Sequence, residues 1–150
     1  MPAPATPRMP RPEPDPCPCG RRDRRGAVLP YAQCCGRYLD HFAQAPAPDA
    51  ESLMRSRYTA FVRERADYLL ATWHPSHRPD RLDFGPGVKW LGLEVRAHAE
   101  RDAGHAEVEF VARQRDRSGA ATRLAERSRF VREKDEGGLL RWYYIDGVMR

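Results

Sequence analysis

Four cysteines near the start of the chain lie in two close pairs, Cys17 with Cys19 and Cys34 with Cys35. Zinc in proteins takes four nitrogen or sulfur ligands in a tetrahedron, and four thiolates complete that shell without leaving a position for water. The cysteine spacing therefore predicts a metal site with a structural rather than a catalytic role. Four free or redox-active thiols are the alternative.

The segment between the two cysteine pairs carries Arg21, Arg22, Arg24 and Arg25. A guanidinium group can donate two parallel hydrogen bonds to the oxygens of one phosphate, so this loop is a candidate anion-binding site. The chain has a formal net charge of +5, and nearly all of its 26 basic residues are arginine. A solvated loop in an arginine-rich protein is the alternative that we favour.

A second set of side chains that could do chemistry is spread over the rest of the chain. Arg57 interrupts an apolar helical neighbourhood, and His74 follows Trp73 directly. Arginine, histidine and two carboxylates beside aromatic walls would make an acid–base pocket. The candidate cavity residues are Arg57, Tyr58, Trp73, His74, Trp90, Phe110, Glu126, Trp142, Tyr144 and Asp146.

A structural role is the favoured alternative for these candidate cavity residues. Arg57 would then pair with Glu126 or Asp146, because a buried charge needs a partner. The three tryptophans would belong to the core. A single histidine before a proline is more often a cap or a surface residue than a catalytic group.

Two helices are expected to open the main part of the chain. Asp49 can cap the first helix through its side-chain oxygen. An apolar stripe at three- and four-residue spacing follows over residues 54–62. Residues 64–67 form a corner before a second short helix, which Pro75 ends because the residue before proline avoids the helical region.

The apolar period changes from helical to two after residue 88, which predicts strands separated by glycine-containing turns. Helices followed by an antiparallel meander indicate an α+β fold, with the helices packed on one face of a curved sheet. Such a twisted sheet can leave a conical pocket. The strands include residues 91–95, 106–113, 124–131 and 139–145, and the turns lie at 102–104, 118–119 and 136–138.

The chain divides into four parts. Residues 1–16 are rich in proline and are expected to form a disordered leader. Residues 17–40 hold the cysteine module, residues 41–49 a Pro/Ala linker, and residues 50–150 the main domain. No apolar stretch is typical of a secretory signal or a membrane span. We therefore expect a cytoplasmic protein without membrane contact, a compartment in which clustered cysteines usually bind metal.

The segments Cys17-Pro18-Cys19-Gly20 and Tyr31-Ala32-Gln33-Cys34-Cys35-Gly36 resemble the SEC-C motif, the zinc-binding tail of the SecA translocation ATPase that recurs in other bacterial proteins. The resemblance implies a structural zinc ion held by Cys17, Cys19, Cys34 and Cys35. The usual motif continues Gly-Ser-Gly-Lys and reaches the second pair sooner. The longer arginine-bearing segment here departs from that loop.

A wider resemblance covers nearly everything after residue 16 and identifies the chain as a member of the YchJ family, bacterial proteins of uncharacterised function with an N-terminal SEC-C motif. It implies a cone-like main domain of the nuclear transport factor-like (cystatin-like) fold, whose cavity serves catalysis in some proteins and binding in others. One departure is Ala125, where the family commonly has histidine before the glutamate. The matching segments include residues 51–62, 67–75, 90–93, 108–112, 128–130 and 142–147.

Three functions follow as hypotheses. The leading one is a binding or adaptor protein, because a closed metal site is joined to a domain without a recognised catalytic constellation. Its zinc knuckle would contact an unknown protein or ribosomal partner, and the cone would hold a small molecule. The second hypothesis is a small-molecule enzyme of isomerase, dehydratase or hydrolase type. The third is an RNA- or ribosome-associated protein, suggested by the arginine loop and the positive charge.

Overall fold

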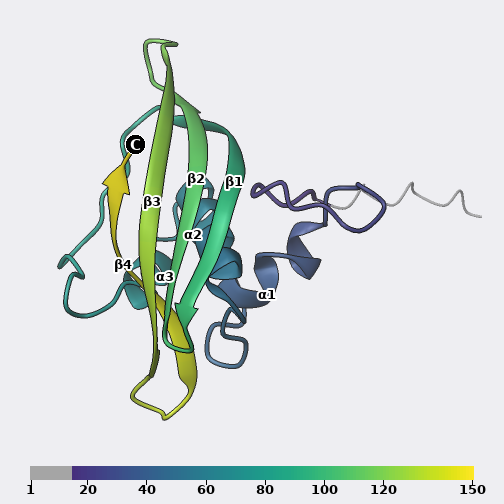
Figure 1. The fold of residues 1–150 in the computed structure, drawn as a ribbon. Coiled ribbons are helices and arrows are strands. Elements are labelled where there is room, and N and C mark those ends of the chain that lie inside the picture. Colours follow the sequence, from purple (N-terminus) through teal and green to yellow (C-terminus); the bar gives the residue numbers. More distant parts are fainter. Residues whose placement is uncertain (1–14) are drawn as a thin grey trace, which may run out of the picture.

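The computed structural model describes residues 15–150, so the predicted leader lies almost entirely outside the described residues. Helices α2 and α3 lie behind a four-stranded sheet in Figure 1. The predicted α+β fold is confirmed. Its elements are a 3-10 turn at Tyr31–Gln33, α1 (Gly36–Leu39), α2 (Ala50–Val62), α3 (Ala66–Ala71), β1 (Lys89–Asp102), β2 (His105–Arg115), β3 (Ala121–Lys134) and β4 (Leu140–Met149).

Helix α2 begins as the sequence predicts. The Asp49 carboxylate accepts a hydrogen bond from the Ser52 amide at 2.7 Å, which satisfies one of the free N–H groups of the first turn. The helix ends at Val62, and Glu64 takes a left-handed φ of 53° at the predicted corner before α3. None of the helices in residues 15–150 has the length and apolar character that a membrane crossing requires.

The sheet is an antiparallel meander in the order β1-β2-β3-β4, with hairpin turns at the three predicted places. One irregularity in it matters for the site. Arg129 pairs with Asp146 and Phe130 pairs with Tyr144, so Ile145 is an extra residue on β4. Such a bulge reverses the inside–outside alternation of the strand beyond it.

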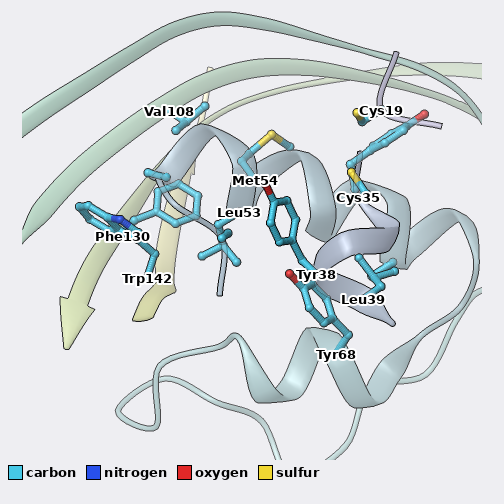
Figure 2. Close-up of a cluster of buried hydrophobic side chains, with 14 of the residues drawn as sticks. Cys19, Cys35, Tyr38, Leu39, Leu53, Met54, Tyr68, Val108, Phe130 and Trp142 are labelled. Carbon is cyan, nitrogen blue, oxygen red and sulfur yellow. The ribbon is translucent and has the colours of Figure 1, made fainter. Parts of the chain in front are cut away.

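The buried side chains form one cluster that includes the cysteines. Cys17, Cys19, Cys34 and Cys35 are at most 3% exposed and belong to the same apolar core as the helices and the sheet. Figure 2 shows Leu53 and Met54 of α2 between Cys19 and Cys35 on the right and Phe130 and Trp142 on the left. The cysteine module is therefore packed into the fold and is not a separate appendage.

The predicted Pro/Ala linker is also packed against the main domain. The Phe42 ring meets the edge of the Tyr68 ring at 6.0 Å between centroids, and the Arg141 guanidinium lies 4.0 Å over Phe42. Arg141 also donates to the Ala43 carbonyl at 3.3 Å. These contacts join the chain before α2 to helix α3 and strand β4.

Candidate metal centre and ligand cavity

The four cysteine sulfurs converge on one point. All four Sγ atoms lie within 4.8 Å of one another, and those of Cys19 and Cys34 are 3.6 Å apart. A tetrahedral ion with metal–sulfur bonds of about 2.3 Å places its sulfurs about 3.8 Å apart. The residues therefore fit a four-coordinate metal ion, and the fully protein-ligated shell would leave no position for a substrate.

The cysteine cluster favours the thiolate at Cys17. Hydrogen bonds from Cys19, Cys34 and Cys35 hold the pKa of the Cys17 thiol far below its ordinary range. Sharing its proton with Cys17 raises the pKa of the Cys35 thiol. A cluster that already stabilises one thiolate is prepared for a cation, because metals bind the deprotonated sulfur.

The cysteine cluster lies against helix α2. Cys17 Sγ is 3.7 Å from Thr59 Oγ1, and Arg55 donates to the Cys19 carbonyl at 3.1 Å. At the end of the same helix, Arg63 lies 3.8 Å over the Tyr31 ring and bonds Asp15 at 2.5 Å. The cysteine module of residues 17–40, called the knuckle below, therefore contacts α2 along the length of the helix.

The arginine segment folds as a small hairpin. Its tip is held by the Asp23 carboxylate, which accepts from the amides of Arg25 at 2.8 Å and Ala27 at 3.0 Å. Gly26 supplies the left-handed φ of 85° that this turn needs.

The four arginines do not gather into one site. Arg21 turns back to α2, where it donates to Ser52 Oγ at 3.0 Å. Arg22 donates to the Gly26 carbonyl at 2.6 Å inside its own loop. Arg24 and Arg25 are exposed at the tip. This arrangement matches the solvated-loop alternative better than a phosphate clamp.

A cavity of about 360 Å³ lies between helix α2 and the inner face of the sheet. Its walls are mostly apolar, and Met149, which is 60% exposed, lies at its rim. Seven of the ten candidate cavity residues line it: Arg57, Tyr58, Trp73, Trp90, Phe110, Glu126 and Tyr144. Seven further lining residues were not among the candidates: Met54, Phe61, Ala112, Leu124, Ser128, Phe130 and Met149.

Arg57 is a buried cation in the cavity wall. It is 6% exposed, and its Nη1 donates to the Leu69 carbonyl at 2.7 Å and to Thr72 Oγ1 at 2.6 Å. Its guanidinium lies 5.2 Å from the Trp73 ring and 4.6 Å from the Tyr144 ring. Burial lowers the pKa of Arg57 to about 10, which leaves it charged at neutral pH.

The predicted ion pair of Arg57 with Glu126 or Asp146 is absent from the described residues. Glu126 instead accepts from Ser128 Oγ at 3.3 Å and lies 3.5 Å from the Tyr144 hydroxyl. Burial raises the pKa of Glu126 above its ordinary value. The cavity therefore holds one cation and one carboxylate that do not neutralise each other directly.

Gly147 makes room for the Glu126 side chain. A Cβ atom at this position would lie 2.1 Å from Glu126 Oε1. Ser128 and Gly147 are opposite each other on β3 and β4, beyond the bulge at Ile145. The bulge thus places a residue without a side chain beside the half-buried carboxylate.

Asp146 was predicted to line the cavity but lies on the outer face of the sheet. Its carboxylate accepts two hydrogen bonds from Arg129, from Nε and Nη2, both at 2.7 Å. The extra residue at Ile145 is the physical reason, because it turns Asp146 away from the face that Tyr144 shares.

His74 and Trp142 also lie outside the cavity. Residues 72–74 pair with the edge of β4 at Tyr144, which turns Trp73 inward and His74 outward, where His74 Nε2 meets Glu133 at 2.9 Å. Trp142 is 5% exposed and, with Phe42 and Leu53, lines a second, very small pocket that shares no lining residue with the cavity. This position agrees with the alternative stated for the tryptophans, in which Trp142 belongs to the core and not to a cavity.

Known proteins resemble this chain over most of its length. Residues 49–147 match the family described as YchJ, middle NTF2-like domain. A UPF0225 protein from Polaromonas sp. is 69% identical over 131 residues, which cover 87% of this chain and 91% of that protein. A UPF0225 protein from Bordetella pertussis is 53% identical over 126 residues, covering 83% and 90%.

Two solved structures share the fold. A SEC-C motif containing protein from Psychrobacter arcticus is 32% identical with a TM-score of 0.74, covering 90% of this chain and 82% of that one. A SEC-C motif containing protein from Rhodopseudomonas palustris is 33% identical with a TM-score of 0.69, covering 89% and 97%. With its cysteine motif and its NTF2-like domain, the chain belongs to the YchJ family of bacterial proteins.

Proposed function

We propose that the protein is a binding protein whose cavity holds a small organic molecule with a substantial apolar part. The observation that carries the proposal is Arg57, a nearly buried guanidinium that opens on an apolar cavity and has no carboxylate partner among the described residues. Leaving a charge unpaired in an apolar wall is costly, so such a group usually has a binding or catalytic use.

We further propose that the metal is zinc and that its role is structural. Four thiolates form the ligand set that zinc prefers, and the closed shell leaves no site for chemistry. The contacts of the knuckle with α2, the helix that carries Arg57 and Tyr58, support a bracing role. A reducing, cytoplasmic setting would keep the thiols available to the ion.

An adaptor that recognises a protein or ribosomal partner through the knuckle has less support. Arg21 is turned toward α2, and the exposed Arg22 hydrogen-bonds within its own loop, so Arg24 and Arg25 at the tip are the arginines best placed for a partner. The cavity offers the more developed recognition site, with shape, apolar walls and two fixed charges.

Binding of the small apolar probe indole, followed by saturation-transfer NMR, tests the proposal. Ala112→Leu adds bulk inside the cavity, whereas Ala125→Leu makes the same change on the opposite face of the sheet. We expect Ala112→Leu to weaken indole binding by at least about tenfold. The Ala125→Leu variant should bind like the wild type. Equal binding by both variants, or no binding by the wild type, would remove the cavity as the functional site.

A second candidate function is a small-molecule enzyme that uses Glu126 as an acid or base. The raised pKa of this carboxyl inside the cavity favours it, because catalytic carboxyl groups often have such values. A ligand recovered chemically unchanged after long incubation with wild-type protein supports binding alone. Turnover that Glu126→Gln abolishes while binding persists would establish the enzyme.

A further inference from the structure

We infer that the cavity ligand is a free α-amino acid with a large apolar side chain. Its carboxylate would bind Arg57, its ammonium group would bind Glu126, and its side chain would occupy the apolar walls. The inference rests on the proposed ligand-binding function and adds the chemical class of the ligand. Three features of the cavity support it.

The first feature is the free edge of the Arg57 guanidinium. Nη1 is used by Leu69 and Thr72, whereas Nε and Nη2 donate no hydrogen bond within residues 15–150. Nε and Nη2 are the two atoms with which Arg129 holds the Asp146 carboxylate. An arginine edge of this kind matches a carboxylate in geometry and charge. The guanidinium lies beside the Trp73 and Tyr144 rings, which themselves meet edge to face at 5.2 Å, and its Nη1 holds two hydrogen bonds. These contacts restrict the guanidinium, so the edge is preorganised.

The second feature is the position of Glu126 on the same cavity. Tyr144 contacts both charged groups, because the Arg57 guanidinium lies 4.6 Å over its ring and its hydroxyl lies beside Glu126 Oε1. No Lys, Arg or His nitrogen in residues 15–150 pairs with Glu126, although hydroxyl groups contact it. An ammonium group is the ligand chemistry that would neutralise this carboxylate.

The third feature is the charge balance. A simple carboxylate ligand would neutralise Arg57 and leave Glu126 as an unpaired anion beside it, and a simple amine would do the reverse. A zwitterion neutralises both charges at once. The volume of about 360 Å³ is near the small end of ligand pockets, which suits a molecule of amino-acid size.

Three ligands with the same ring separate these contributions in calorimetric titrations. L-phenylalanine carries both charges, 3-phenylpropanoate only the anion, and 2-phenylethylamine only the cation. We expect L-phenylalanine to bind at least about tenfold more tightly than either half-ligand. That ratio corresponds to about 1.4 kcal/mol.

Two substitutions assign the charges. Arg57→Gln should weaken L-phenylalanine and 3-phenylpropanoate by at least about tenfold and leave 2-phenylethylamine unweakened. Glu126→Gln should weaken L-phenylalanine and 2-phenylethylamine and leave 3-phenylpropanoate unweakened. Outer-face controls Arg129→Gln and Glu109→Gln should change none of the three. If Arg57→Gln does not fold, Arg57→Lys replaces it, with partial loss for the two carboxylates.

Equal affinities for the three ligands would overturn the inference. Preference for one half-ligand over L-phenylalanine would do the same and would identify the ligand as a simple acid or amine. In both cases indole binding that Ala112→Leu weakens would leave the proposed binding function intact. Loss of indole binding as well would remove the proposed function itself.

Discussion

Arg57 and Glu126 are opposite charges that share one apolar cavity without forming an ion pair. Burial shifts both toward their neutral forms, lowering the pKa of Arg57 and raising that of Glu126. Each shift means that the folded protein holds the charged form less favourably than water does. At the scale of single residues, the cavity therefore reduces stability, as binding and catalytic sites often do.

The charge on Glu126 should destabilise the fold at neutral pH. Because the pKa of Glu126 is raised in the folded state, the folded protein holds this proton more tightly than the unfolded chain. Stability should therefore fall as pH rises above the ordinary glutamate value of 4.5. We expect Glu126→Gln to be more stable than wild type at pH 7, by about 0.5 kcal/mol because solvent near the cavity screens the charge.

Urea unfolding of Glu126→Gln and wild type at pH 7 and pH 4 measures this effect. The difference should shrink at pH 4, where much of Glu126 is protonated. Glu109→Gln on the outer face provides a matched control, with a change within about 0.5 kcal/mol. A Glu126→Gln variant that is less stable at pH 7 would show that the carboxylate has a stabilising partner.

The β3–β4 hairpin positions the carboxylate at the scale of elements. The bulge at Ile145 turns Asp146 outward and brings Gly147 under the Glu126 side chain. Helix α2 does the same for the cation, since its capped start at Asp49 fixes the register of the turns that carry Arg57. The position of Glu126 therefore depends on the bulge at Ile145, and that of Arg57 on the helix cap at Asp49.

Gly147→Ala should displace Glu126, because the new Cβ would lie 2.1 Å from its Oε1. We expect a loss of about 1 kcal/mol in the wild-type background. In a Glu126→Ala background the same substitution should be neutral or slightly stabilising, since alanine suits a strand better than glycine. A double-mutant cycle in urea checks the coupling. Additive effects would mean that the two residues do not compete for space.

Asp49→Ala should destabilise the protein by about 1 kcal/mol, because the Ser52 amide at the start of α2 loses its acceptor. Thermal and urea unfolding measure the change. Asp80→Ala, at an exposed loop position, is the control and should have little effect. If Asp49→Ala and Asp80→Ala unfold alike, the cap does not stabilise the helix.

At the scale of the whole molecule, the knuckle and the main domain share one core. The cysteines lie in the same buried cluster as Leu53, Tyr68 and Phe130. The residue pattern found the cysteine pairs, the helices and the meander because each depends on local spacing. It missed the docking of the knuckle on α2 and the bulge at Ile145, because both are set by contacts between distant segments.

The contrast between local spacing and long-range contacts also explains which cavity predictions were right and which were wrong. Glu126 was selected as a cavity residue, and it lies on the inner face of β3 together with Ser128 and Phe130, as the alternation of a regular strand requires. The prediction that Asp146 shares the inner face with Tyr144 was wrong, because the extra residue at Ile145 reverses the alternation of side chains along β4. Such a bulge leaves no clear mark in the sequence. The expected ion pair of Arg57 was wrong for another reason. Aromatic rings and a backbone carbonyl contact the Arg57 guanidinium in place of a carboxylate.

Metal removal should destabilise the entire chain, because the sulfurs belong to the common core. We expect a chelator, or Cys35→Ser, to lower the free energy of unfolding by at least about 2 kcal/mol, or about 4–8 °C in Tm. Differential scanning calorimetry should show one transition that moves, and restored zinc should reverse the chelator effect. A main transition that stays in place while a small one disappears would make the knuckle an independent unit.

The most direct test of the cavity as a ligand site is a titration with L-phenylalanine followed by ¹H–¹⁵N NMR of the full chain. We predict that the largest shifts occur at the Arg57 Nε–H and at the indole N–H groups of Trp73 and Trp90, which line the cavity. The buried Trp142 indole, outside it, should move less. Shifts concentrated at Arg24 and Arg25, or none at all, would contradict a ligand site in the cavity.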